Sequence, residues 1–532
     1  MRLKREPKSE RHAREVRNAS LADPIRCAGF AMSVVTATYA WHAASAAARI
    51  EDAVEAVRPQ AEAYIAAGMQ TFDLPGLAIG IVADDKLVYS RGFGTRSKNG
   101  PAVGPRTVFQ IGSATKGFLA ATQAIMVDRG RLKWDDRVID LDPAFSMHDP
   151  WVTREFRVFD LLAQRSGLPP YANDALGIVG LDRAALIRSL RYVEPVSSFR
   201  TTFAYTNVTH IMAGRIVAKV AAAADWNAVL QKELLDPLGM HDTSYTAAAI
   251  ETAPDHASGY RWAPTGTVEV PFTQIFPYDF DGAGDINSTV EDAARWLRLQ
   301  LGHGTFEGRQ IVSAANLAAT HTPKVAISPT VTYALGWVVQ QTPNGTIVWH
   351  NGGTSAFGSY FGLLPERNVG VVILTNEANV GLPDALGRWL MDRILGNPPV
   401  DVVAEVHKSA LANFQRSVDL FARPDKPRPF PPLAPLAGSF VNQGIGKVVV
   451  TQEGDGLTMR LEATGARLTL TPWDGEVFTA SVVPEGRFKA ISEDLGPLPS
   501  AFVQFQIGKD GKLGVLHLSF DDGQAYDFTR EQ

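Results

Sequence analysis

The stretch Val108-Phe109-Gln110-Ile111-Gly112-Ser113-Ala114-Thr115-Lys116 and the apolar segment that it opens decide how this chain folds. Residues Ser113 to Arg129 are apolar nearly all round and are followed by Gly130, which predicts a buried helix with a glycine stop. Residues three apart lie on one face of a helix, so the side chains of Ser113 and Lys116 can meet. The unpaired N–H groups and partial positive charge at the helix start favour an alkoxide on Ser113.

Lys116 is a candidate base for this hydroxyl. A serine is a poor nucleophile at neutral pH and needs a base within hydrogen-bond reach. Burial at the foot of a helix disfavours the charged ammonium, which lowers the pKa of a lysine toward the neutral form. Taken alone, the tetrapeptide also fits an ordinary helix start with a solvated lysine.

Two further motifs follow in order, Tyr205-Thr206-Asn207 and His350-Asn351-Gly352. Each motif alone also fits a purely structural role. His350 could be a hydrogen-bonded surface histidine, and Gly352-Gly353 could form an ordinary turn. In this order and spacing the three motifs predict the active site of a serine acyl-transferase or hydrolase. The glycine pair would let a substrate lie close to the backbone.

The three motifs resemble those of the penicillin-binding proteins and class C β-lactamases, which carry Ser-x-x-Lys, Tyr-x-Asn and Lys-Thr-Gly. The branch resembled has His-x-Gly in third place and includes D-aminopeptidases and esterases. The similarity runs from about Ala53 to about Asn397. Within that range lie four further stretches typical of the family: Leu74 to Ala78, Asp160 to Pro169, Gly282 to Thr289 and Gly358 to Pro365.

The resemblance implies roles for individual residues. Ser113 would attack the carbonyl, while Lys116 and Tyr205 relay its proton to the leaving group. Asn207 would hold Lys116 and a substrate amide, and His350 would bond to Tyr205 and orient it.

The resemblance also implies an oxyanion hole made by the backbone N–H groups of Ser113 and Gly353. Gly352 and Gly353 would line the substrate. No metal ion or organic cofactor is implied.

Two departures from the family pattern bear on function. Most relatives have histidine where this chain has Gln164, a position expected to support the loop before Ser166. His350 stands where the penicillin enzymes usually carry a lysine that helps to hold a substrate carboxylate. A neutral imidazole holds a carboxylate less well, which argues against efficient β-lactamase or carboxypeptidase action.

The expected substrate is therefore a peptide, including one with D-residues or a linearised peptide such as linear microcystin, or a small ester. A class C-type β-lactamase is the alternative enzyme. A non-catalytic penicillin-recognising binding protein, which acylates without turnover, is the alternative from another class.

Length and composition agree with an enzymatic domain and an additional domain. The chain of 532 residues, with 45% hydrophobic content, is long enough for more than one core. A net charge of -5 and the lack of a basic stripe give no hint of a nucleic-acid partner. Self-association into a homo-oligomer stays open.

Residues 1–48 resemble an export signal with a long basic leader. The moderately apolar stretch Ala28 to Trp41 is followed by small residues that predict cleavage near Ala46 or Ala48 and a periplasmic or secreted protein. The apolar stretch is too short for a retained membrane span. A disordered cytosolic leader is the alternative.

Residues 49–400 are expected to form an α+β hydrolase domain of the β-lactamase/transpeptidase type. A helix over 51–70 and strands Leu77 to Val82 and Leu87 to Phe93 precede a mostly helical region. Three more strands are predicted at Thr346 to His350, Gly358 to Leu364 and Val369 to Leu374. Strands from both ends would complete one antiparallel sheet, flanked by helices, with a helical subdomain between them.

The remaining chain has a different character. Residues 401–435 predict a helix, Asp401 to Ala422, and a stiff Pro-rich linker. Residues 436–532 hold short alternating runs and four Asp-Gly turns, which predict a hairpin-built antiparallel β domain. This domain resembles the lipocalin-like barrel of some relatives. Three roles stay open for it: capping the cleft, mediating oligomerisation, or only packing against the rest of the chain.

Overall fold

The computed structural model describes residues 50–398, 400–508, 512–521 and 523–531. The predicted leader and its cleavage sites near Ala46 and Ala48 lie outside these residues. Within the described residues, no helix is both long and apolar enough to cross a membrane.

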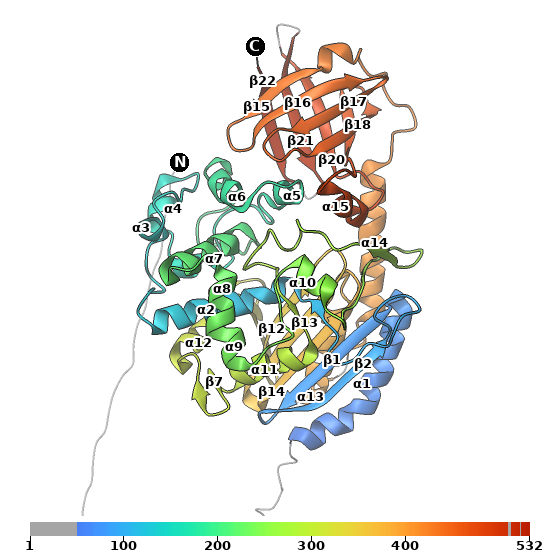
Figure 1. The fold of residues 1–532 in the computed structure, drawn as a ribbon. Helices are drawn as coiled ribbons and strands as arrows, with labels where there is room; N and C mark the ends of the chain where they lie inside the picture. Colours follow the sequence, from blue (N-terminus) through green and yellow to red (C-terminus); the bar gives the residue numbers. More distant parts are fainter. Residues whose placement is uncertain (1–49, 399, 509–511, 522, 532) are drawn as a thin grey trace, which may run out of the picture. The chain divides into compact units, whose positions relative to one another are not determined.

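The central element is an eight-stranded antiparallel sheet with strands in the order β2-β1-β14-β13-β12-β11-β10-β9. Figure 1 shows β1, β2 and β12 to β14 of this sheet. The prediction that strands from both ends of the region share one sheet is confirmed, because β1 pairs with β14. The strands are β1 Gly76–Ala83, β2 Lys86–Gly94, β9 Val325–Ala326, β10 Val331–Tyr333, β11 Val338–Thr342, β12 Gly345–Gly353, β13 Gly358–Leu364 and β14 Val369–Thr375.

Both faces of this sheet are buried, which explains why β1 and β14 read as continuous apolar runs. On one face, Leu77, Ile79 and Ile81 pack in a cluster with residues of α1 and α13. On the other face, Ala78 and Val82 belong to the cluster that contains α2 and α11. The alternation follows from the two-residue period of a strand.

Helices cover the sheet and build the region between its two halves. The predicted first helix is confirmed as α1, Ile50–Phe72. The others before the barrel are α2 Thr115–Asp128, α3 Val138–Leu141, α4 Pro150–Glu155, α5 Asp174–Ile178, α6 Arg183–Ser189, α7 Val208–Ala221, α8 Trp226–Leu230, α9 Asp236–Leu238, α10 Ala247–Thr252, α11 Val290–Leu301, α12 Ala314–His321, α13 Leu382–Leu395 and α14 Val403–Phe421. Short strand pairs are β3 Phe109–Gln110 with β6 Asn287–Ser288, β4 Gly259–Arg261 with β5 Val268–Val270, and β7 Thr305–Phe306 with β8 Arg309–Gln310.

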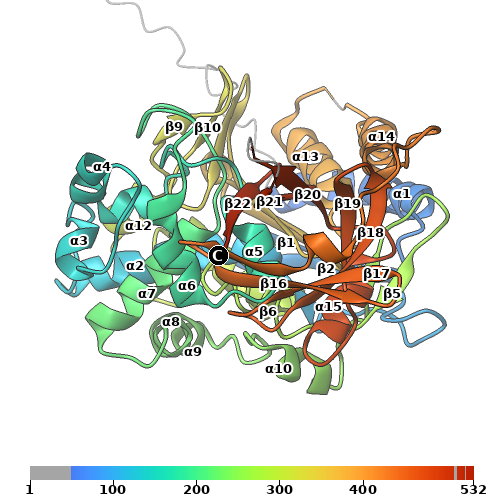
Figure 2. The same cartoon turned by 90° about the horizontal axis from the view of Figure 1, so that it is seen from above.

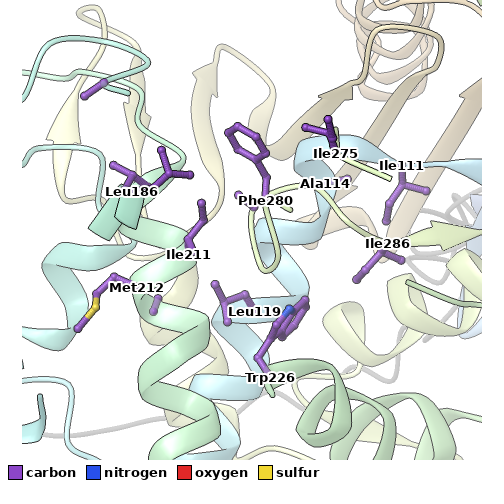
Figure 3. Packing of buried hydrophobic residues seen from close by; sticks show 14 of the residues in the cluster. Ile111, Ala114, Leu119, Leu186, Ile211, Met212, Trp226, Ile275, Phe280 and Ile286 are labelled. Carbon is purple, nitrogen blue, oxygen red and sulfur yellow. The ribbon is translucent and has the colours of Figure 1, made fainter. Parts of the chain in front are cut away.

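The helix α2 runs through the middle of the core, as its apolar sequence predicts. A 3-10 turn, Gly112–Ala114, leads into it, and every residue from Thr115 to Met126 is buried. Figure 3 shows Ala114 and Leu119 of this segment among Ile211 and Met212 of α7 and the side chains of Trp226 and Phe280. The core therefore holds the start of α2 rigidly between α7 and the loop before β6.

The C-terminal region is a closed eight-stranded antiparallel barrel, best seen from above in Figure 2. Its strands are β15 Gly438–Asn442, β16 Gly446–Glu453, β17 Gly456–Leu461, β18 Arg467–Asp474, β19 Val477–Val482, β20 Ala501–Ile507, β21 Leu513–Phe520 and β22 Ala525–Arg530. The predicted Asp-Gly turns at Asp455-Gly456 and Asp474-Gly475 join neighbouring strands; Asp510, Gly511 and Asp522 lie outside the described residues. A short helix between β19 and β20, α15 Phe488–Leu495, was not predicted.

Large side chains fill the inside of this barrel. Phe440, Met459, Phe478, Phe505 and Phe528 are all buried, and Phe478 packs edge-on against Phe505. Small eight-stranded barrels are just wide enough for side chains to fill. The interior thus serves as a hydrophobic core.

The barrel packs on the helical region. Arg487 Nη2 donates to Gly180 O at 3.0 Å, and a Cβ added at Gly180 would lie 2.9 Å from the Phe488 ring. Tyr526 Oη bonds to Asn173 Oδ1 at 3.0 Å. The Pro-rich linker is likewise held, because Arg428 forms an ion pair with Asp474 of β18.

Candidate active site

Ser113 and Lys116 meet at the start of α2. Lys116 is fully buried, and its Nζ lies 3.1 Å from Ser113 Oγ, 2.7 Å from Asn207 Oδ1 and 2.8 Å from Ala283 O. Burial lowers the pKa of Lys116 to about 7, although the charges of Asp174 and Asp285 partly oppose this shift. A large share of Lys116 is therefore neutral at neutral pH.

The surroundings of Lys116 leave one direction for its lone pair. A neutral amine has two N–H donors and one lone pair, and Asn207 Oδ1 and Ala283 O accept the two donors. The remaining neighbour is Ser113 Oγ. The geometry suits acceptance of the serine proton.

Tyr205 lies over the same lysine, with its ring centroid 4.7 Å from Lys116 Nζ. Its hydroxyl is buried and forms no hydrogen bond with the part of the chain that the structure describes. Burial raises the pKa of Tyr205 well above its usual value, which Tyr333 reinforces and the nearby Ser113 hydroxyl partly offsets. An unpaired buried hydroxyl is costly in a folded chain. Tyr205 therefore keeps its proton and has unused hydrogen-bonding capacity beside Ser113.

Asn207 and Tyr205 are held by residues distant in sequence. Asn207 Nδ2 donates to Asp174 Oδ2 at 2.6 Å, which turns its Oδ1 toward Lys116. Gln164 pairs with Thr206 between them: its Oε1 accepts from Thr206 N at 2.7 Å, and its Nε2 donates to Thr206 O at 3.1 Å. Gln164 thus braces the tyrosine motif rather than only the loop before Ser166.

The histidine of the third motif is placed differently from the prediction. His350 is almost fully buried; its Nδ1 bonds to Asn351 O at 2.5 Å and its Nε2 to Tyr333 Oη at 3.0 Å. The expectation that His350 bonds to Tyr205 is wrong, because the two rings are 6.2 Å apart between centroids and Tyr333 occupies Nε2. Burial lowers the pKa of His350 to about 3, and Lys116 adds to this, so the imidazole is neutral and carries no charge toward a substrate.

Gly353 lies beside the turn that carries Ser113. A Cβ added at Gly112, where φ is +51°, would lie 2.7 Å from Gly353 N. The strand β12 continues past His350 and ends at Gly353, which pairs with Gly358 of β13. This close approach brings the backbone of the Ser113 turn beside the end of β12, and Ser113 and Gly353 both line the cavity described below. Gly352 is buried against Ile111, since a Cβ there would collide with Ile111 O.

The chain contains a second Tyr-x-Asn triplet, Tyr171-Ala172-Asn173. The structure places it at the edge of the site: Tyr171 is half exposed with its ring 5.6 Å from that of Tyr205, and Asn173 Nδ2 donates to Ser189. Only Asn207 contacts Lys116. Tertiary contacts therefore distinguish the two triplets.

These residues open into a cavity of about 700 Å³. Ser113, Tyr205, Asn207 and Gly353 line it, and so does Asp521 from the barrel. Aromatic side chains of Tyr171, Phe203, Phe276 and Phe280 form much of its wall. Among the described residues that line it, the charged ones are all acids: Asp174, Asp384 and Asp521.

Several supporting residues carried no signal in the sequence. Asp174, Tyr333 and Asp384 hold Asn207, His350 and Asn351 respectively, across 33, 17 and 33 residues of chain. Asp384 also accepts from Asn379 Nδ2 at 2.9 Å. None belongs to a local motif, so an alignment or a structure is needed to find them.

Comparison with known proteins identifies the class of protein that carries this fold and site. The model of the Beta-lactamase family matches residues 61–395, well over half of the chain, and that of a domain of unknown function, DUF3471, matches residues 422–530. The chain therefore belongs to the Beta-lactamase family.

Particular relatives extend this finding. An unguisins hydrolase of Aspergillus violaceofuscus is 26% identical over 84% of this chain and 87% of its own length. Penicillin-binding protein 4 of Amycolatopsis lactamdurans is 27% identical over 70% of this chain and 94% of its own length. The octameric penicillin-binding protein homologue from Pyrococcus abyssi shares the fold, with a TM-score of 0.58 at 21% identity over 89% of this chain and all of its own.

Proposed function

We propose that this protein is a serine hydrolase that forms an acyl-enzyme on Ser113 and acts on peptide or ester bonds. The observation that carries the proposal is the bonding of Lys116: both donors of the neutral amine are taken, and its remaining neighbour is Ser113 Oγ. A base poised near neutral pH and within reach of a hydroxyl is what nucleophilic catalysis requires.

In the first step, Ser113 Oγ bonds to the substrate carbonyl carbon and its proton passes to Lys116. The N–H groups of Ser113 and Gly353 stabilise the oxyanion. The proton then passes through Tyr205 to the leaving amine or alcohol as its bond to carbon breaks. Water, deprotonated by the same route, attacks the acyl-enzyme and releases Ser113.

The charge of the cavity lining favours neutral or amine-bearing substrates and disfavours substrates that carry a carboxylate beside the scissile bond. Its charged lining is acidic, and the neutral His350 supplies no cation to hold a carboxylate. Peptides with apolar side chains, including D-residues or linearised peptides, suit the aromatic wall. The relative named as an unguisins hydrolase supports a hydrolytic role.

Related parts of the proposal concern the whole chain. We assign residues 49–400 to the hydrolase domain, 401–435 to the connecting helix and linker, and 436–532 to a lipocalin-like β domain. Export to the periplasm or outside, with cleavage near Ala46 or Ala48, follows from the basic leader. The octameric homologue supports a test for self-association.

Labelling with a fluorophosphonate tests the assignment of the nucleophile. We expect wild type to label at Ser113 and Ser113→Ala to lose all labelling, while its stability stays within about 1 kcal/mol because only a hydroxyl is removed. Retained labelling in Ser113→Ala at full stoichiometry would refute the proposal.

A substrate panel then separates the candidate functions. p-Nitrophenyl esters and D-amino-acid p-nitroanilides should turn over steadily, and nitrocefin poorly. Rapid nitrocefin turnover would favour a β-lactamase. A burst without steady turnover on every substrate would favour a penicillin-recognising binder.

A further inference from the structure

The turn between β12 and β13 lies directly behind Gly353. Thr354 to Phe357 form this turn, which Thr354 N closes by donating to Phe357 O at 3.0 Å. On one side, Thr354 Oγ1 donates to Gln110 Oε1 at 2.8 Å. Gln110 ends β3, so this bond ties the turn to the segment that leads to the nucleophile.

The turn is held from its other side by the β barrel. Ser355 Oγ donates to Asp494 Oδ2, on the barrel helix α15. Asp494 is 2% exposed, and its second oxygen, Oδ1, has no hydrogen-bond partner among the described residues. Gly496 lies two residues after Asp494, at the end of α15. A Cβ added at Gly496 would lie 2.8 Å from Arg261 Cζ, so the Arg261 guanidinium packs against the end of this helix.

A buried carboxylate with one hydrogen bond is an expensive way to join two surfaces. Desolvation penalises its charge, and an apolar pair of similar volume would pack at lower cost. Buried polar contacts that cost stability are expected where a side chain fixes the position of a functional group. What Asp494 holds is the residue two positions beyond Gly353.

An oxyanion hole acts only if its donors are fixed before the reaction, because a displacement of about 1 Å can cost roughly 10²-fold in rate. From the hydrolase side the turn is held by the ladder partner Gly358, by the Gln110 bond and by Tyr260 N, which donates to Ala356 O at 3.2 Å, whereas the Ser355 side chain is held by the barrel. We propose that Asp494 is a positioning residue of the reaction: through Ser355 it holds the Gly353 N–H, so the barrel supplies part of the oxyanion hole's rigidity. This inference rests on the proposed function.

The test uses the full-length chain and a p-nitrophenyl ester, with kcat and KM measured separately. Asp494→Ala should lower kcat about tenfold, less than the loss of an oxyanion donor itself, and leave KM within about twofold, because substrate binding does not use this bond. Asp494→Asn keeps an acceptor oxygen for Ser355 and should restore most of kcat. Glu493→Ala is the matched control, since it removes the adjacent carboxylate of α15, which is exposed.

A double-mutant cycle shows whether the effect passes through Ser355. Ser355→Ala should lower kcat as Asp494→Ala does, and the double variant should lose no more than either single variant. Multiplying losses in the double variant would overturn the inference, and so would wild-type kcat in Ser355→Ala. Because Ser355→Ala leaves the barrel intact, its kcat tests the positioning role even if Asp494→Ala fails to fold.

The outcomes also separate this inference from the proposed function. If Ser113→Ala still labels, the proposed function fails regardless of Asp494. If Ser113→Ala abolishes labelling while Asp494→Ala and Ser355→Ala label at the wild-type rate, only the positioning role fails. In that case the bond merely fastens the barrel.

Discussion

Lys116 is the residue on which the proposed chemistry depends, and burial rather than a partner makes its neutral form available at neutral pH. Burial lowers its pKa to about 7, and three hydrogen-bonding neighbours fix its nitrogen in place. A surface lysine at the same spacing would be charged at neutral pH and would have no lone pair to offer.

This pKa predicts the pH dependence of acylation. Lys116 must be neutral to accept a proton, so kcat/KM for an uncharged ester should rise about tenfold per pH unit below pH about 7 and level off above it. His350, with a pKa of about 3, cannot supply that inflection. A rate that falls as pH rises through neutrality would contradict the role of Lys116.

Asp285 provides a control for this assignment. Its buried carboxyl group lies close enough to influence Lys116 but is mostly protonated at neutral pH, so Asp285→Asn should leave the inflection near pH 7 in place. Burial raises the pKa of Asp285 itself to about 8, with Asp281 adding to it. Loss of the inflection in Asp285→Asn would instead assign it to the carboxyl group.

The charge of the cavity predicts substrate preference at the same scale. A peptide amide should have a higher kcat/KM than the matched peptide acid, because the charged side chains among the described residues that line the cavity are the acids Asp174, Asp384 and Asp521. The pair is measured at one pH and at two salt concentrations, since screening should narrow the difference. Equal kcat/KM values for the peptide acid and the peptide amide at low salt would show that the cavity lining does not discriminate substrates by charge.

At the scale of elements, the site depends on how closely the start of α2 approaches the end of β12. Gly112 has a φ of +51° and leaves no room for a Cβ beside Gly353 N. Two segments distant in sequence thereby meet at the residues proposed to form the oxyanion hole.

Gly112→Ala tests this approach. We expect it to push Gly353 away and to lower kcat by roughly 10²-fold, in addition to destabilising the fold. Gly130→Ala is the matched control: its φ is +66°, and nothing lies within 4 Å of the added Cβ. It should cost about 1 kcal/mol of stability without lowering kcat. Equal kinetic effects of the two substitutions would show that the contact with Gly353 is unimportant.

At the scale of the whole molecule, the hydrolase region and the barrel share a hydrophobic cluster. Buried residues of α15, Phe488 and Ile491, belong to the same cluster as Leu181 of the helical region. Barrels of this kind often follow a linker as separate units, but here the linker and the barrel are both tied down.

The shared cluster predicts cooperative unfolding. We expect one calorimetric transition for the full chain, and a lower melting temperature and slower labelling at Ser113 for a chain that ends at Arg423. Two well-separated transitions, with the lower one leaving labelling intact, would mean that the regions unfold independently.

Several features could be predicted from the sequence because they depend on local patterns. The apolar run after Ser113 predicted α2, and short runs bounded by turn residues predicted β1, β2 and β12 to β14 within a few residues. The same local signals predicted a hairpin-built C-terminal region, which is the closed barrel. Three short motifs, by their order and spacing, predicted the residues that gather around Lys116.

Only the tertiary structure decided which side chains meet across the chain. It showed that Tyr333 rather than Tyr205 bonds to His350, that Asp174 turns Asn207 toward Lys116, and that Asp494 of the barrel reaches Ser355. Propensity and periodicity act over a few residues, whereas these contacts join segments that are brought together by packing within the sheet, the helical region and the barrel. The sequence by itself therefore determined the elements and the chemical groups of this protein, and long-range packing determined their partners.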